Sequence, residues 1–572
     1  MHRRAAAFAA AFALIAGGGV AAAETAGAPA AAVVASTPRA DIPVAPVRLR
    51  RSDLASQQAF SRAYRAMLAS RATSLSQAGQ GIFLYGGFPE AVPIQDVDGD
   101  HGDDVLEIRG TAVKGPAVAV RSGRTGRQKW VVPVDALYAV EYVPVPGGRS
   151  VVLTYSETQD GEDALLAFAG TTTFTVQALD ATTGAQIWST DWTGVLTFSP
   201  AAVTLVGLAM PGGVLKTRPG GHPTLLIDSF DEVYTDVSDT LRGHLEYVDL
   251  VTGQSTGPTK DVDGEASFSP VGDMDADGTD DVVEVESAGT ITALSGVDAH
   301  SLWTVQSQAK FDYAAAYLSA DMTGDRRPDV FVSAGTFDDQ AGSLVALDGR
   351  TGHQLWQHAA SGARSLGDID RDGRSDTRLL TYVGSAIRYT AVSSSGRTLW
   401  STTVTPTVPR TSALSWLAGD LDGDGIQDSY VRLVDRSEAG SSIGKRSFVV
   451  NGRTGRLAEH PDWGIPVGDS LDGRGDDFAR TATVLANGAQ RVVLTVVDGR
   501  SGRTEWQRQL PVESSAGLAD VWAGNFSGTG RMDLLDILTE PDRAVVVVQQ
   551  GHSGRTSWSG AYDTRGGGKP IF

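Results

Sequence analysis

The chain has 572 residues, of which 68 are acidic and 48 are basic, so its formal net charge is −20. It contains no cysteine, which excludes disulfide bonds, thiolate metal sites and a cysteine nucleophile. Nucleic-acid binding needs clustered Lys and Arg, so a net negative chain is not expected to bind nucleic acid. Apolar residues make up 41% of the chain, which is too many for a wholly disordered protein.

Residues 1–23 have the pattern of a secretory signal peptide. A short basic segment, Met1–Arg4, is followed by an apolar run to Val20 and by the small residues Ala21–Ala23, which form a cleavage site. An N-terminal membrane anchor is the alternative interpretation. No other apolar run is long enough to span a membrane. We therefore expect a secreted or otherwise extracytoplasmic protein without a membrane span.

The remaining chain divides into four segments by composition. Residues 24–48 are rich in Ala, Pro and Val, which predicts a flexible linker. Residues 49–79 carry apolar side chains at a spacing compatible with one short helix. Residues 80–562 contain an internal repeat, and residues 563–572 are expected to form a flexible tail.

A glycine turn followed by a tryptophan recurs along the repeat region. Clear copies are Ser122–Gly126 before Trp130 and Asp348–Gly352 before Trp356. Nine such turns recur at intervals of roughly 53 residues, and apolar and β-branched residues flank them. Such periods are typical of β-propellers with four-stranded blades. The sequence therefore predicts an all-β propeller. We expect eight blades, with nine as the alternative count and a β-solenoid or several small β-domains as alternative folds.

The second recurring motif is a loop with aspartates at its first, third, fifth and ninth positions. Glycine at the sixth position, as in Gly278, Gly373 and Gly425, allows a tight bend. Clustered carboxylate oxygens suit Ca²⁺, which takes six to eight oxygen ligands, better than Mg²⁺, which demands tighter octahedral geometry. Ordinary Asp-Gly hairpin turns are the alternative interpretation.

We expect each acidic loop to bind one Ca²⁺ ion, and four copies carry the full pattern. A weaker copy has threonine at the third position, and degenerate copies begin at Asp469 and Asn525. The expected ligands are Asp96, Asp98, Asp100 and Asp104; Asp273, Asp275, Asp277 and Asp281; Asp321, Asp325 and Asp329; Asp368, Asp370, Asp372 and Asp376; and Asp420, Asp422, Asp424 and Asp428.

The two motifs resemble two known repeat families. The segment Ala418–Val431, with an acidic loop between apolar strands, looks like the FG-GAP/VCBS repeats of integrin α-subunits and of many secreted bacterial proteins. The segment Ala346–Trp356 looks like the tryptophan-docking repeat of propellers of the pyrroloquinoline-quinone type. This second resemblance implies that each tryptophan packs between adjacent blades. The absence of cysteine argues against a quinone dehydrogenase, many of which carry an adjacent-cysteine disulfide.

We expect no catalytic residue and no organic cofactor from the sequence. The segment Gly440–Gly444 matches the G-x-S-x-G pattern, but it lies in a strand repeat and not in a strand-to-helix elbow. The expected function is a calcium-binding, non-catalytic binding, adhesion or scaffold module, monomeric, with an extracellular protein or glycan as its ligand. The alternatives are a carbohydrate-active enzyme similar to polysaccharide lyases, a glycan-binding lectin, or an assembly factor at the cell envelope.

Overall fold

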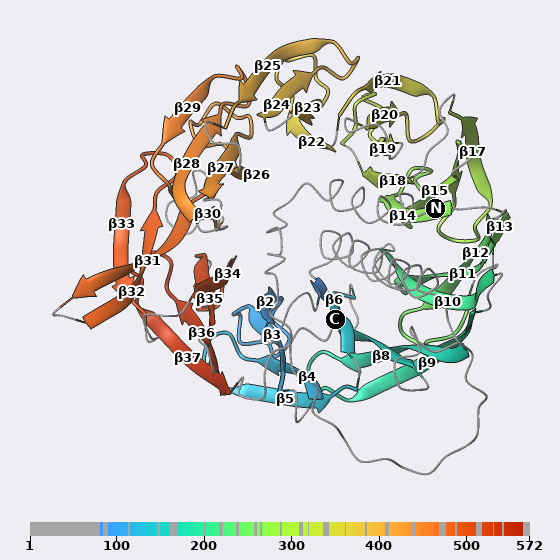
Figure 1. The fold of residues 1–572 in the computed structure, drawn as a ribbon, viewed down its shortest axis with the longest axis horizontal. Coiled ribbons are helices and arrows are strands. Elements are labelled where there is room, and N and C mark those ends of the chain that lie inside the picture. Colours follow the sequence, from blue (N-terminus) through green and yellow to red (C-terminus); the bar gives the residue numbers. More distant parts are fainter. Residues whose placement is uncertain are drawn as a thin grey trace, which may run out of the picture.

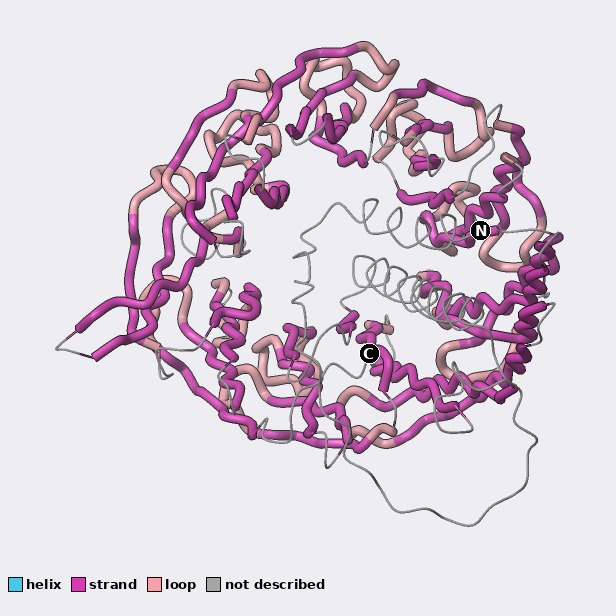
Figure 2. Tube along the Cα trace, in the orientation of Figure 1, coloured by secondary structure: helices cyan, strands magenta, loops and turns pink. Residues whose placement is uncertain are grey.

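The computed structural model describes residues 81–83 and, apart from gaps in connections between strands, residues 90–563. These residues form 37 strands and no helix. Strands follow one another around the whole ring (Figure 2). The expected signal peptide, linker and short helix, and the tail beyond residue 563, lie outside the described residues. Within the described part, no helix is long and apolar enough to cross a membrane.

The described strands form a propeller of nine four-stranded antiparallel blades (Figure 1). The first strand of each blade lies nearest the centre, and the fourth lies at the rim. The expectation of eight blades is therefore wrong, and the alternative count of nine is confirmed. Every one of the nine glycine turns belongs to a blade, including the two repeat units that lack an acidic loop.

The strands of blades one to three are β2 (Glu90–Ile94), β3 (Asp104–Thr111), β4 (Gly115–Arg121) and β5 (Gln128–Pro133); β6 (Leu137–Val143), β7 (Val151–Gln159), β8 (Ala169–Asp180) and β9 (Gln186–Phe198); and β10 (Ala202–Leu215), β11 (Thr224–Thr235), β12 (Asp239–Asp249) and β13 (Lys260–Asp263). Blades four to six contain β14 (Ala266–Gly272), β15 (Asp281–Glu286), β16 (Thr290–Leu294) and β17 (Ser301–Gln306); β18 (Tyr313–Leu318), β19 (Val330–Gly335), β20 (Ser343–Leu347) and β21 (Gln354–His358); and β22 (Gly362–Gly367), β23 (Asp376–Val383), β24 (Ala386–Val392) and β25 (Thr398–Val404). Blades seven to nine contain β26 (Thr411–Leu417), β27 (Ser429–Arg436), β28 (Ser442–Val450) and β29 (Leu457–His460); β30 (Ile465–Pro466), β31 (Phe478–Ala486), β32 (Ala489–Val497) and β33 (Thr504–Gln509); and β34 (Gly517–Gly524), β35 (Asp533–Thr539), β36 (Arg543–Gln549) and β37 (Thr556–Asp563).

Blades two and three are joined into one sheet, unlike the other blades. β9 pairs with β10 between residues 195 and 206, so the rim strand of blade two continues into the inner strand of blade three. A short strand, β1 (Gly81–Phe83), pairs with β6 and completes a nine-stranded sheet. The acidic loops are missing from these two blades, which instead have the longest strands of the described chain.

The position of a strand within its blade determines its pattern of apolar residues. The second strand packs against neighbouring blades on both faces, and in β15 five consecutive residues are buried. The rim strand packs on one face only, and in β17 Trp303 is the one buried residue. Continuous apolar runs therefore mark second strands, whereas a rim strand such as β17 alternates polar residues around one tryptophan.

Each rim tryptophan docks onto the glycine turn of the next blade, as the resemblance to docking repeats implied. The indole Nε1 of Trp400 donates to the carbonyl oxygen of Gly452 at 2.9 Å. A Cβ atom added at Gly455 would lie 2.5 Å from the Trp400 ring, and this glycine has a φ of 68°. Glycine is required here because a side chain would occupy the space of the indole.

The same docking contact closes the ring. Trp558 of blade nine donates to the carbonyl oxygen of Gly123 in blade one at 2.5 Å. An apolar cluster joins Ala91 and Val105 of blade one to Leu535 of blade nine. Each of these blades is built from one continuous chain segment, so side-chain packing and contacts between loops close the ring without exchange of a strand.

The junction between blades three and four lacks this docking contact. β13 contains no tryptophan, and the turn position that is glycine elsewhere is Ala299, with a φ of 56°. A methyl group fits here because no indole covers the turn. Lys260 on β13 instead forms an ion pair with the buried Glu284 of blade four.

Candidate metal centres in the acidic loops

The acidic loops join the first and second strands of their blades, and the glycine turns join the third and fourth strands. In an antiparallel blade these two connections lie at the same end. The aspartate at the ninth loop position links them directly. In blade five, Asp329 accepts hydrogen bonds from the backbone N–H groups of Gly349 in the turn at 3.0 Å and of Met322 in the loop at 2.5 Å.

This closing aspartate has the same role in six blades and is at most 1% exposed in each. One carboxylate oxygen accepts from the second residue of the turn, and the other accepts from the loop itself. The corresponding aspartates are Asp104, Asp281, Asp329, Asp376, Asp428 and Asp533.

The loop also favours glycine after the first turn position, although blade six has Ser394 there. A Cβ atom at Gly349 would lie 2.0 Å from the carbonyl oxygen of Pro328 in the acidic loop. Blades two and three have no acidic loop, and there the same position holds Ala181 and Leu250. A turn that begins with Asp-Gly or Ser-Gly is therefore a sequence signal for a loop packed against it, a signal that the sequence interpretation did not use.

The first aspartate of each loop folds the backbone around its own carboxylate. Asp420 accepts from the N–H groups of Gly423 at 2.8 Å, Asp424 at 2.9 Å and Gly425 at 2.8 Å. Glycine at the sixth position has a positive φ, as expected, and the fourth position has one as well. Non-glycine residues hold this conformation at Ala276 and Arg371, which is a cost that the surrounding hydrogen bonds offset.

Three of the four expected carboxylates converge in every loop with the full pattern. Those at the first, third and ninth positions place ligand atoms within 4.8 Å of one another. The converging groups are Asp96, Asp98 and Asp104; Asp273, Asp275 and Asp281; Asp368, Asp370 and Asp376; and Asp420, Asp422 and Asp428.

The fifth-position carboxylates are not members of these converging groups. Asp277, Asp372 and Asp424 each accept from the backbone N–H two residues later, and Asp100 accepts from Gly102 in the same way. In the loop of blade five, Asp321, Asp325 and Asp329 do not form such a group, and Thr323 occupies its third position. Asp469 and Asp472 lie outside the described residues.

Burial and neighbouring carboxylates raise the pKa of the closing aspartates in blades one, four, five, six and seven. Loss of solvation is the larger cause, and it raises the pKa values of Asp104 and Asp281 to about 7 and of Asp428 to about 6. Backbone hydrogen bonds oppose this rise, whereas other aspartates of the same loop add to it. A cation among these carboxylates would favour their ionised form and remove their mutual repulsion.

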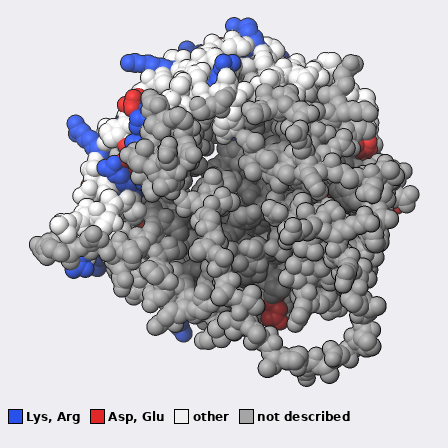
Figure 3. All heavy atoms as spheres, viewed as in Figure 1, with Lys and Arg blue, Asp and Glu red and all other residues white. Residues whose placement is uncertain are grey.

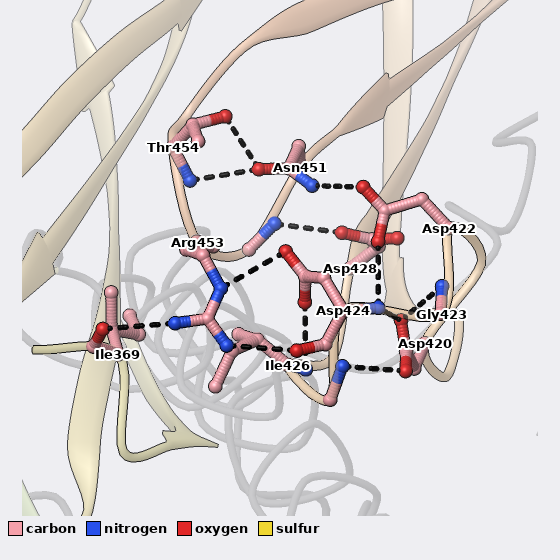
Figure 4. Close-up of polar contacts among 12 residues, drawn as sticks. Ile369, Asp420, Asp422, Gly423, Asp424, Ile426, Asp428, Asn451, Arg453 and Thr454 are labelled. Carbon is pink, nitrogen blue, oxygen red and sulfur yellow. Dashed lines mark hydrogen bonds and ion pairs between the residues drawn. The ribbon is translucent and has the colours of Figure 1, made fainter. Parts of the chain in front are cut away.

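Arginines connect neighbouring loops around the ring. In blade seven, the guanidinium of Arg453 contacts the carboxylate of Asp424 at 3.2 Å and the carbonyl oxygen of Ile369 in the loop of blade six at 3.2 Å (Figure 4). Asn451 donates to Asp422 at 2.7 Å in the same view. Arg327 of blade five reaches the Met274 carbonyl of blade four in the same way. In both cases, an arginine of one blade donates to the carbonyl oxygen of the second loop residue in the preceding blade.

Blade one differs from the others because a lysine side chain enters its loop. The ammonium of Lys129 on β5 forms an ion pair with Asp98 and lies 3.4 Å from Oδ2 of Asp104. Both carboxylates belong to the converging group of this loop. The sequence interpretation missed Lys129, and its position directly before the docking tryptophan was the available signal.

On the face of the ring seen in Figure 3, the charged side chains that the structure describes are mainly basic. In Figure 3, Lys and Arg side chains stand along the upper and left edges, with few Asp or Glu among them. The net negative charge of the chain is therefore not evident on the part of this face that the structure describes.

Comparison with known proteins supports the propeller type of repeat. A family model described as outer membrane protein assembly factor BamB matches residues 271–443. No curated protein matches the chain. Among solved structures, BamB from Moraxella catarrhalis is similar at 14% identity over 73% of this chain and 96% of that chain, with a TM-score of 0.32.

Two further solved structures are similar at comparable levels. The exotype rhamnogalacturonan lyase YesX has 13% identity, a TM-score of 0.30 and coverage of 84% of this chain and 90% of that chain. Sqt1 from Saccharomyces cerevisiae has 10% identity, a TM-score of 0.34 and coverage of 72% and 93%. Likenesses at these identities extend no further than the fold.

Proposed function

We propose that the protein is an exported, calcium-binding β-propeller of the FG-GAP/VCBS type that acts as a non-catalytic binding or scaffold module. The observation that carries this proposal is the convergence of three carboxylates at the same place in four blades. Export is supported by the basic, apolar and small-residue pattern of residues 1–23.

The donor set supports a hard divalent cation. Each converging group offers carboxylate oxygens alone, with no nitrogen or sulfur ligand, and such oxygens suit Ca²⁺. The first and ninth carboxylates in each loop are already oriented by backbone N–H groups, as is the third in blades one, four and seven, so little ordering remains to be done when an ion binds. Asp368 and Asp376 of blade six are oriented in this way.

The proposed role of calcium is structural. Because the closing aspartate joins the loop to the glycine turn, an ion at this carboxylate would tie together both connections of a blade. An ion that binds only the folded blade adds its binding free energy to the free energy of unfolding. The ring would then present a rigid surface to an extracellular protein or glycan.

Calorimetric titration of Ca²⁺ into the EDTA-treated full chain tests the proposal. We expect at least three ions per chain and a higher melting temperature in calcium than in EDTA. Asp422→Asn should bind one ion fewer, because Asp422 belongs to the converging group of blade seven. Asp191→Asn in blade two is the matched control and should bind as many ions as the wild type.

Failure to bind calcium, or an Asp422→Asn variant that binds as many ions as the wild type, would contradict the ligand assignment. A glycan array and capture by immobilised calcium-loaded protein then separate a glycan ligand from a protein ligand. Cleavage of an arrayed polysaccharide would refute the non-catalytic role and favour a polysaccharide lyase.

A further inference from the structure

We propose that Lys129 supplies the cation of the acidic loop in blade one, so that this loop does not take Ca²⁺ while its counterparts do. The inference rests on the proposed calcium binding and deepens it, because it divides the four loops of identical pattern into two kinds. The Lys129 ammonium occupies the place that a calcium ion would take in the loops of the other blades.

The position of Lys129 in the blade explains how it reaches the loop. In β5, Trp130 pairs with Val120 and Gln128 pairs with Arg121, so Lys129 is an extra residue at a β-bulge. Every other docking tryptophan follows the same irregularity, which leaves one unpaired residue before it. A bulge redirects the side chain of the extra residue.

In blades four and six the bulge residue also packs close to the acidic loop. In blade four it is Leu302, which packs against the cluster that contains Met274, the second residue of that loop. In blade six it is Leu399, which packs against the cluster of Ile369, again the second loop residue. Blade one alone has a cation there among the seven bulge positions before a docking tryptophan.

The ammonium lies where a metal ion would have to lie. Lys129 contacts Asp98 and approaches Asp104, two of the three carboxylates that converge in this loop. Its side chain is only 12% exposed. A calcium ion needs oxygen ligands at about 2.3–2.6 Å, so the ion and the ammonium compete for the same oxygens.

Basic side chains near the other loops do not have this arrangement. Arg397 contacts one converging carboxylate of blade six, Asp370, and is 69% exposed. Arg453 pairs with Asp424, which is outside the converging group of blade seven. Within the part of the chain that the structure describes, the converging aspartates of blade four form no ion pair; these are Asp273, Asp275 and Asp281.

Because the blade-one loop lies where the ring closes, the use of lysine in place of calcium there affects ring closure. The blade-one loop forms part of the closing contact of the ring, where Asp103 donates to the carbonyl oxygen of Asn525 at 3.0 Å and accepts from its N–H at 2.7 Å. A lysine keeps one positive charge among these carboxylates when calcium is scarce. Ring closure is therefore independent of calcium, whereas blades four, six and seven depend on it.

The test is to count bound calcium in the EDTA-treated full chain after titration. Lys129→Met removes the ammonium and preserves the length of the side chain, so this variant should bind one ion more than the wild type. Its melting temperature should fall in EDTA and recover in calcium. Lys445→Met, at an exposed lysine on β28, is the control and should leave the count unchanged.

A second pair of variants covers the case in which Lys129→Met does not fold. Asp98→Asn should bind as many ions as the wild type, whereas Asp275→Asn, at the same position in blade four, should bind one fewer. Loss of an ion from Asp98→Asn, or an unchanged count in Lys129→Met, would overturn the role of Lys129 alone. A wild-type chain that binds no calcium would overturn the proposed function as well.

Discussion

Blades two and three and blades four, six and seven achieve the same four-stranded form by different means. In blades two and three the strands reach 14 residues, and β9 and β10 unite the two blades in one sheet. In blade four no strand exceeds seven residues, and an acidic loop ties its inner strand to its glycine turn. Long hydrogen-bonded ladders therefore take the place of loop carboxylates where those are missing.

If the proposed calcium binding is correct, this difference confines its effect to one part of the ring. The blades with converging carboxylates contain buried acidic groups that a cation would stabilise, whereas the connections at residues 144–150 and 216–223 contain no acidic residue. Four predictions, in order of decreasing effect, test this difference between blades with and without acidic loops.

Removal of calcium should have the largest effect. An ion present at 100 times its dissociation constant contributes about 2.7 kcal/mol, so three such sites contribute roughly 8 kcal/mol to the free energy of unfolding. Hydrogen exchange followed by mass spectrometry should show faster exchange in EDTA at residues 273–281, 368–376 and 420–428. An equal increase in the exchange rate in blades two and three would contradict the idea that calcium stabilises only the blades with acidic loops.

Loss of a docking tryptophan should be costly in both regions, because both use the same contact. Trp188→Ala removes the indole that docks onto blade three, and Trp400→Ala removes the one that docks onto blade seven. Each should lower the free energy of unfolding by about 3–5 kcal/mol, as for other large-to-small core substitutions. Urea denaturation measures the loss, and Trp522→Ala at a 38% exposed tryptophan is the control.

A large difference between Trp188→Ala and Trp400→Ala in saturating calcium would be informative. It would mean that the continuous sheet of blades two and three already holds their junction without the indole.

Blade two should show a pH dependence that calcium does not alter. Burial raises the pKa of Glu141 from 4.5 to about 7, and the Tyr155 hydroxyl donates to it at 2.9 Å. The folded state therefore holds a proton that the unfolded state releases, and stability falls as pH rises from about 4.5 to about 7. The loss amounts to about 3 kcal/mol, at 1.36 kcal/mol per pKa unit.

Glu141→Gln preserves the acceptor for Tyr155 and should remove the part of this fall that Glu141 causes. Denaturation of the variant and of the wild type at pH 5 and pH 8 in EDTA would measure the difference. Glu505→Gln, at an exposed glutamate, is the control and should retain it. A fall in Glu141→Gln as large as that of the wild type would assign the effect to other acids.

The turn glycines should show the smallest and most local effects. Gly455→Ala places a methyl group against Trp400 in a left-handed backbone conformation, and overpacking of this kind costs about 1–3 kcal/mol. Ala299→Gly, at the junction without a tryptophan, should change stability by less than about 1 kcal/mol. Thermal melting of both variants measures the contrast, and equal losses would contradict the docking explanation for glycine.

Much of the fold could be predicted because each repeat unit carries its own local signals. Glycine with a positive φ, a tryptophan four residues later and aspartates at fixed spacing are all visible within one unit, as in Asp348–Trp356. The blade count could not be derived as securely, because units two and three lack the acidic loop and still complete blades. The fifth-position aspartates were expected among the converging carboxylates, yet they fold onto their own backbone instead.

The sequence by itself determined the all-β propeller, its docking turns and the place of the acidic loops, because these depend on residues close together in the chain. Tertiary structure alone decided how the ring closes, which two blades merge and which carboxylates converge. It also decided that Lys129 enters the first loop, because a β-bulge redirects a side chain 25 residues beyond Asp104 toward it. Such contacts depend on the packing of distant strands, which spacing along the chain does not encode.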